Sequence, residues 1–117
     1  MKYKTDNNQV TIKIYDVVKT KSPMTEEDGK KIYKKIESYK ESNSDKKLII
    51  NFENIESATT AVINNSIAIL VKNEGIEQVA SYLRLRNVKN DLIKTVINLS
   101  LELAQEKYEL KNRISRS

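Results

Sequence analysis

The residues best suited to chemistry lie where a short apolar run ends and a helical pattern begins, at Thr59 and Thr60. The first turn of a helix offers unpaired N–H groups and a partial positive charge, which would stabilise a phosphate on either hydroxyl. Hydroxyl residues also cap helix N-termini without any modification, and Ser57 or Thr59 could do so here. The junction therefore has two interpretations, a phosphorylation switch and a plain helix cap.

Catalytic and metal chemistry have little support in the sequence. The chain contains no histidine and no cysteine, so the commonest general base, the commonest metal ligand and every thiol are missing. Glu53 and Glu56 could act as a carboxylate pair, but their surroundings are typical of a solvated surface loop. Two glycines cannot build a phosphate-binding glycine loop. We therefore expect no catalytic residues, no metal site and no cofactor.

Basic residues form a second candidate site. Four of them gather around the end of a predicted third strand: Arg84, Arg86, Lys89 and Lys94. Sites in open α/β sheets collect at the carboxyl ends of the strands, so we expect this cluster and the hydroxyl junction on one rim. The cluster would suit an acidic protein surface or a nucleic-acid backbone, and a solvated strand end is the alternative.

The overall charge is compatible with a polyanionic partner. The net charge is +5 and the pI is near 9.3. Residues 1–22 and 79–117 are basic, whereas residues 23–78 are slightly acidic. Lysines also keep small proteins soluble and are frequent in AT-rich genomes, so the charge alone does not identify a partner. The apolar runs are too short for a signal peptide or a membrane span, and we expect a soluble cytoplasmic protein.

Hydrophobic periodicity predicts three strands that alternate with three helices. Residues 10–15 alternate apolar and polar side chains, and residues 48–52 are apolar on both faces, as a central strand covered by helices requires. The predicted elements are strands at 10–15, 48–52 and 79–85, and helices that begin near Thr25, Thr60 and Asn90. This alternation favours an α/β layer with a mostly parallel central sheet and helices packed on it.

The length of 117 residues suits one domain, which we place at residues 1–106. Residues 1–8 could add a short strand, and residues 42–45 form a turn cluster. Residues 107–117 are expected to be a basic tail, frayed or disordered. Gly29 falls on the apolar stripe of its helix, where close approach to the sheet would explain it.

The last predicted helix has an apolar face wider than one contact with a sheet needs, and its members are Leu92, Ile93, Val96, Ile97, Leu99, Leu103 and Ala104. Leu101 lies off the line formed by Leu92, Val96, Leu99 and Leu103. A homodimer through this helix is therefore a hypothesis.

The order of these motifs resembles the STAS-like domains of unknown function found in bacteria and their mobile elements. The resemblance is carried by Gly29 with Ile32 and by residues 48–55, 59–65 and 83–88, and it spans residues 10–104. It implies a small β-α-β-α-β-α fold and a module that binds other proteins. In anti-sigma-factor antagonists of the wider STAS group, a hydroxyl at the start of this helix is the phosphorylation switch, which indicates Thr59 and Thr60, then Ser57.

The chain departs from the family pattern at Asn51, Val62 and Asn65, where relatives usually carry an aspartate, a phenylalanine and an acid. We expect a non-enzymatic STAS-like regulatory or interaction module that binds a macromolecular partner, and another protein is the first expectation. The alternative is an accessory protein of a phage or mobile element, such as an inhibitor of a host defence system, that binds nucleic acid or a nucleic-acid enzyme.

Overall fold

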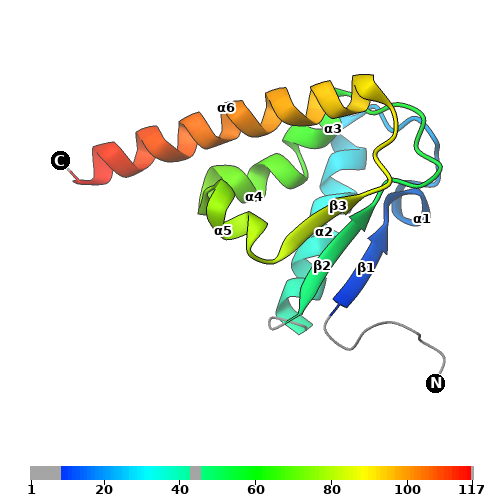
Figure 1. Ribbon diagram of the computed structural model, residues 1–117, viewed down its shortest axis with the longest axis horizontal. Helices are drawn as coiled ribbons and strands as arrows, with labels where there is room; N and C mark the ends of the chain where they lie inside the picture. Colours follow the sequence, from blue (N-terminus) through cyan, green and yellow to red (C-terminus); the bar gives the residue numbers. More distant parts are fainter. Residues whose placement is uncertain (1–8, 43–45, 117) are drawn as a thin grey trace.

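The computed structural model describes residues 9–42 and 46–116, with side chains as far as residue 113. The strand predicted at residues 1–8 and most of the turn predicted at residues 42–45 lie outside the described residues. Figure 1 shows a small sheet with helices packed beside it and a long C-terminal helix across the top. The predicted α/β class, with a parallel sheet and packed helices, is confirmed.

Three parallel strands form the sheet, in the order β1 (Gln9–Lys13), β2 (Lys47–Asn51) and β3 (Leu83–Arg86). Since strand order follows chain order, right-handed crossovers place both helical connections on the same face. Side chains on that face enter the core, with Ile12 2%, Ile50 0% and Leu83 6% exposed. The apolar residues of the strands thus hold the helices on one side of the sheet.

The opposite face of the sheet is open. Its side chains include Thr11, Arg84 and Arg86, which are all exposed. Ile49 is the apolar exception, with 6% exposure, and the strand register places it between Thr11 and Arg84. Our prediction that helices cover both faces of β2 is therefore wrong for the described chain, although Ile49 is buried on this face.

Helix α2 (Glu26–Ser42) begins at the predicted cap, since the Thr25 hydroxyl accepts a hydrogen bond from the Asp28 N–H at 3.1 Å. Its Gly29 approaches α3 (Thr60–Asn64) and not the sheet, which corrects our expectation. A Cβ atom at Gly29 would lie 2.6 Å from the Val62 carbonyl oxygen and 2.7 Å from the Asn65 Cβ. The glycine is therefore needed for contact between two helices.

The connection from β2 to β3 is broken into three short helices, α3, α4 (Ile67–Glu74) and α5 (Ile76–Ala80), where we predicted one helix and a longer strand. The Ser66 hydroxyl donates to the Val62 carbonyl at 2.7 Å where α3 gives way to α4. Gly75, at φ +90°, separates α4 from α5. Val79 is buried within α5, so β3 starts at Leu83.

The first strand is also shorter than predicted. It ends at Lys13, and the chain turns at once into α1 (Ile14–Val18), which closes at Lys19 with φ +60°. Ile14 and Val18 are buried on the inner side of this short helix. Ile14, which the period-2 pattern assigned to the strand, is therefore buried as the first residue of a helix.

The last helix, α6, runs from Asp91 to Arg116, capped by the Asn90 side chain, which accepts from the Leu92 N–H at 2.7 Å. The predicted domain boundary at residue 106 lies inside this helix, so the tail described as far as residue 116 is helical. Tertiary contacts explain the difference: Gln105 accepts from the Ile76 N–H at 2.8 Å, and the Tyr108 ring covers Gly75.

The inner face of α6 differs from our expectation. Ile93, Ile97 and Ala104 are buried, and the helix packs mainly on α3 and α4. Leu92, Leu99 and Leu103 are exposed, whereas Leu101 is partly buried against the core. The predicted apolar face is therefore only partly buried, because three of its leucines lie on the outside.

Candidate functional site

The hydroxyl junction is a helix cap. The Thr59 hydroxyl accepts from the Val62 N–H at 3.4 Å and donates to the Met24 carbonyl at 2.9 Å, so it caps α3 and ties it to the loop before α2. Thr60 is the exposed first residue of α3, and the Ser57 N–H donates to the Lys21 carbonyl at 3.4 Å. The capping interpretation of Thr59 is confirmed, and phosphorylation of these residues stays a prediction.

Asparagines join the loops at the carboxyl ends of the strands. Asn51 accepts through its side-chain oxygen from the Asn87 amide at 2.8 Å and from the Glu53 N–H at 2.9 Å. The Asn90 amide donates to the Glu56 carbonyl at 3.1 Å. The loops that follow β2 and β3 therefore share one rim, as expected. The resemblance expects an aspartate at position 51. Asn51 instead links the end of β2 to the loop after β3, and its side chain carries no charge.

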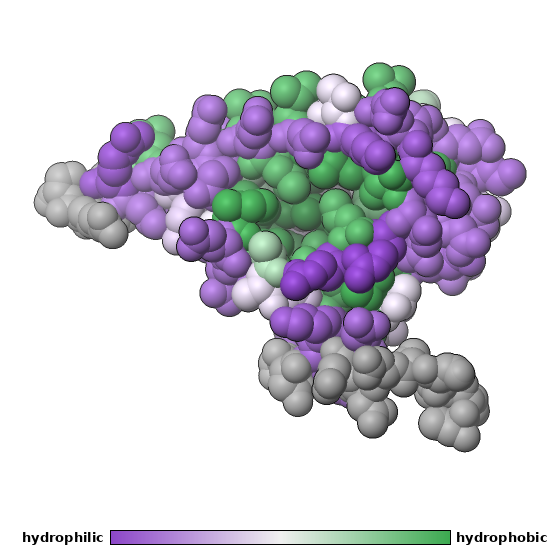
Figure 2. Space-filling view, in the orientation of Figure 1, coloured by the Kyte–Doolittle hydropathy of each residue, from purple (hydrophilic) through white to green (hydrophobic). Residues whose placement is uncertain are grey.

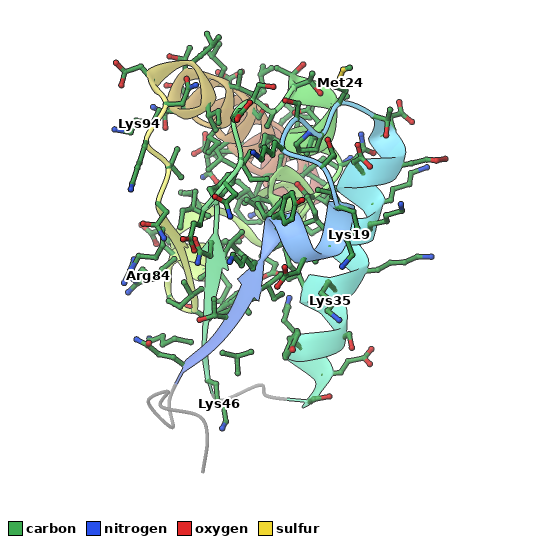
Figure 3. The ribbon with its side chains drawn as sticks, turned by 90° about the vertical axis from the view of Figure 1, so that its right-hand side faces the viewer. Lys19, Met24, Lys35, Lys46, Arg84 and Lys94 are labelled. Atoms are coloured by element: carbon green, nitrogen blue, oxygen red, sulfur yellow. The ribbon has the colours of Figure 1, made fainter. Side chains whose placement is uncertain are left out.

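The four predicted basic residues do not form one cluster. Arg84 and Arg86 project from β3 onto the open face of the sheet, Lys89 lies beside a rim hollow, and Lys94 lies on α6. Figure 3 shows Lys94 and Arg84 pointing outward from these two separate elements. The Arg84 guanidinium donates to the carbonyls of Ala80, at the end of α5, and of Leu83, which holds it near the start of β3.

Two lysines that we did not predict as site residues, Lys13 and Lys47, lie on the same face of the sheet as the two arginines. On the open face, parallel register aligns Arg86 with Asn51 and Asn51 with Lys13, while Lys47 lies at the other end of β2. Lys47 donates to the Ser81 carbonyl at 2.8 Å, and Lys13 lies 3.4 Å from Glu53. All three strands thus contribute cationic side chains to one surface.

A groove beside β1 extends this surface onto α2. It has a volume of about 610 Å³ and lies between β1 and α2, with Lys13 on one side and Lys31, Lys34 and Lys35 on the other. In Figure 3 the strands lie side by side, with Arg84 at the edge of β3 and Lys35 on α2 beyond β1. We define the basic face as these side chains together: Lys13, Lys47, Arg84, Arg86, Lys31, Lys34 and Lys35.

Few carboxylates balance the basic face. Asp16 lines the groove and Glu53 pairs with Lys13, and both carboxylates lie at its margin near the end of β1. The lysines of α2 were visible in the sequence as residues off its apolar stripe, but that pattern is equally typical of a solvated helix. Only the strand order shows that they border the β1 edge of the sheet, while Arg84 and Arg86 lie on β3 at the opposite edge.

A small cavity of about 200 Å³ lies at the amino ends of the strands. Beside it, the Tyr82 hydroxyl donates to Glu74 at 2.8 Å, and the Lys40 ammonium lies 2.8 Å from the other Glu74 oxygen and 5.0 Å from the Tyr82 ring centre. Burial, and then the bond to Glu74, raise the pKa of Tyr82 well above its usual value. Each polar group has a partner, so this network stabilises the contact between α2, α4 and the start of β3.

The described residues offer no other obvious chemistry. They contain no group of three or more acidic side chains placed to hold a metal ion. Within the same part of the chain, every helix is too short or too polar to cross a bilayer.

No protein-family model, curated protein or solved structure matches this chain. The resemblance to STAS-like domains therefore stays a prediction that rests on sequence motifs. What the protein does has to be inferred from its own surfaces, of which the basic face is the most distinctive in charge.

Proposed function

We propose that this protein is a non-enzymatic binding module whose basic face holds the phosphate backbone of a nucleic acid. The observation that carries the proposal is the open face of the sheet, on which three strands place Lys13, Lys47, Arg84 and Arg86, with a lysine-lined groove along the edge at β1. Cations on one continuous surface displace counterions from a polyanion, and this supplies most of non-specific nucleic-acid affinity.

The composition of the basic face favours backbone contact over base recognition. Its charged groups are long lysine and arginine side chains, and Tyr39 is the single aromatic residue among those lining the groove. Arginine and lysine contacts to phosphates position a protein without reading sequence, whereas base recognition of single strands relies on stacked aromatic rings. We therefore expect weak dependence on sequence and strong dependence on salt.

Fluorescence anisotropy with labelled single-stranded DNA, duplex DNA and RNA tests the proposal. The double substitution Arg84→Ala and Arg86→Ala should weaken binding and reduce the slope of log affinity against log salt by about 2, one for each lost phosphate contact. The control removes two exposed lysines elsewhere, Lys72→Ala and Lys111→Ala. Equal losses in both variants, or no binding of any nucleic acid at low salt, would exclude the basic face as the site.

Nucleic acids could show no binding, while a pull-down from the native host captures a protein. If the double substitution Arg84→Ala and Arg86→Ala abolishes that capture, the partner indicated is an acidic protein. Two cytoplasmic roles suit such a module: a STAS-like regulator, and an accessory protein of a phage or mobile element that inhibits a nucleic-acid enzyme. A neighbouring kinase or sensor gene supports the first role, and neighbouring phage or defence genes support the second.

A further inference from the structure

The outer side of α6 carries a leucine stripe that the body of the protein leaves uncovered. Its members are Leu92, Leu99, Leu103 and Leu110, which are 68%, 53%, 56% and 51% exposed. From Leu92 through Val96 and Leu99 to Leu103, the steps along the helix are four, three and four residues. Leu110 follows Leu103 by one heptad. This spacing matches that of a coiled-coil seam, in which leucines at such positions pack against a second helix.

The stripe is separate from the contact that anchors α6. Ile93, Ile97 and Ala104 face α3 and α4, and their positions lie roughly 100° around the helix axis from the stripe, at about 100° per residue. In Figure 2 hydrophobic side chains stand along the upper outline of the molecule, where Figure 1 places α6. The helix therefore has one apolar face for its own domain and another without a partner in the described chain.

We infer that this stripe binds the same stripe of a second copy, with the two α6 helices antiparallel. The arrangement of the leucines is self-complementary in that orientation. A two-fold axis midway between Leu99 and Leu103 pairs Leu99 with Leu103 of the other copy, and the same axis pairs Leu92 with Leu110. The paired segment is about 27 Å long, because 18 residue steps rise about 1.5 Å each.

Charge disfavours the parallel orientation. Glu106 and Arg113 occupy the seam positions on either side of Leu110. In a parallel pair Glu106 of one chain would face Glu106 of the other chain, and Arg113 would likewise face Arg113. Like charges at a partly desolvated seam repel strongly. The antiparallel pair sets Glu106 against Val96. Glu102 then meets its copy only at the solvent-exposed rim, where salt screens the repulsion.

The shape of the monomer also fits this pairing. The C-terminal turns of α6 project past α4 and α5 in Figure 1. In the antiparallel pair these turns, with Leu110, lie along the amino-terminal half of the partner's α6, where Leu92 is the most exposed of the leucines. The projecting end of each helix thereby gains a surface to pack on.

The first test is the mass in solution. Light scattering at tens of micromolar should give twice the 13.5 kDa of one chain, and Leu99→Lys should give the monomer mass. The adjacent substitution Asn98→Lys adds the same charge at an exposed position off the stripe and should remain dimeric. Circular dichroism should show both variants folded. A monomeric wild-type chain, or identical masses for the two variants, overturns the inference.

The second test is the orientation, for which a chain without native cysteine is well suited. A mixture of Leu92→Cys and Leu110→Cys proteins with a short thiol crosslinker should give mixed dimers, whereas neither protein alone should crosslink efficiently. Efficient self-crosslinking of Leu92→Cys would establish a parallel pair and refute the antiparallel register. Both tests are made without nucleic acid, so their outcome is independent of the proposed function.

Discussion

The contact between α2 and α3 makes Gly29 a sensitive point of the fold. Substitution of Gly29 by alanine has two opposing effects on stability. Alanine is a better helix former than glycine by about 1 kcal/mol, so at an open helical position Gly29→Ala would stabilise the protein. At this position the added methyl group would lie 2.6 Å from the Val62 carbonyl oxygen and 2.7 Å from the Asn65 Cβ.

The overlap should outweigh the gain in helix propensity. Ordinary contacts between carbon atoms lie at about 3.5–4.0 Å, so relief requires one helix to shift. One obstructing atom belongs to the backbone and the other is the first atom of a side chain, and neither can rotate away. Overpacking of this kind costs about 1–3 kcal/mol. After the propensity gain we expect a net loss of about 1–2 kcal/mol, or roughly 5 °C in Tm.

Thermal and urea unfolding followed by circular dichroism measure this loss. The matched control is Lys30→Ala, a substitution at the next residue of the same helix, where the side chain is exposed. Its free energy of unfolding should change by less than about 0.5 kcal/mol. An unchanged or raised Tm for Gly29→Ala would show that α2 and α3 are not in close contact, and the helical layer described above would then be wrong.

Three further substitutions test the local geometry. Tyr82→Phe should lower the free energy of unfolding by about 1 kcal/mol through loss of the bond to Glu74. Because burial raises the pKa of Tyr82, the wild type should lose stability as the pH rises above about 10, and the Phe variant should lose less in a urea titration at each pH. Thr59→Ala should cost about 1 kcal/mol in the same assay through loss of the cap, whereas Thr59→Ser should be near wild type. Lys19→Gly should raise Tm, because a left-handed conformation costs a non-glycine residue about 1–2 kcal/mol.

The sequence predicts elements best where local chemistry and tertiary packing agree. Thr25 and Asn90 have strong capping side chains, and the helices start there as predicted. The segment between β2 and β3 is different, because its apolar residues have helical spacing almost throughout. Its breaks occur at Ser66 and Gly75, where hydrogen bonding and a positive φ interrupt the pattern, and the strand that follows begins four residues beyond the predicted start.

The binding surfaces were harder to predict, because they depend on which faces remain uncovered. The sequence predicts Arg84 and Arg86 in one cluster with Lys89 and Lys94, but it cannot show that Lys13 shares a face of the sheet with the two arginines or that a lysine-lined groove borders β1. The same difficulty affects α6, whose predicted apolar face contains both buried and exposed residues. Leucine at 99 and isoleucine at 97 are equally apolar, and only the packing of α3 and α4 shows which of them is inside.

Two exposed surfaces of the described chain have opposite chemistry. With both crossovers on one face, the described residues place no helix on the other face of the sheet, which is basic. Helix α6 has two apolar sides and covers the domain with one of them. Since α6 packs on α3 and α4, an α6 dimer would leave both basic faces open to solvent. Two linked basic faces raise the effective concentration of each for the same polymer, so dimerisation should strengthen binding to long nucleic acids far more than to short ones.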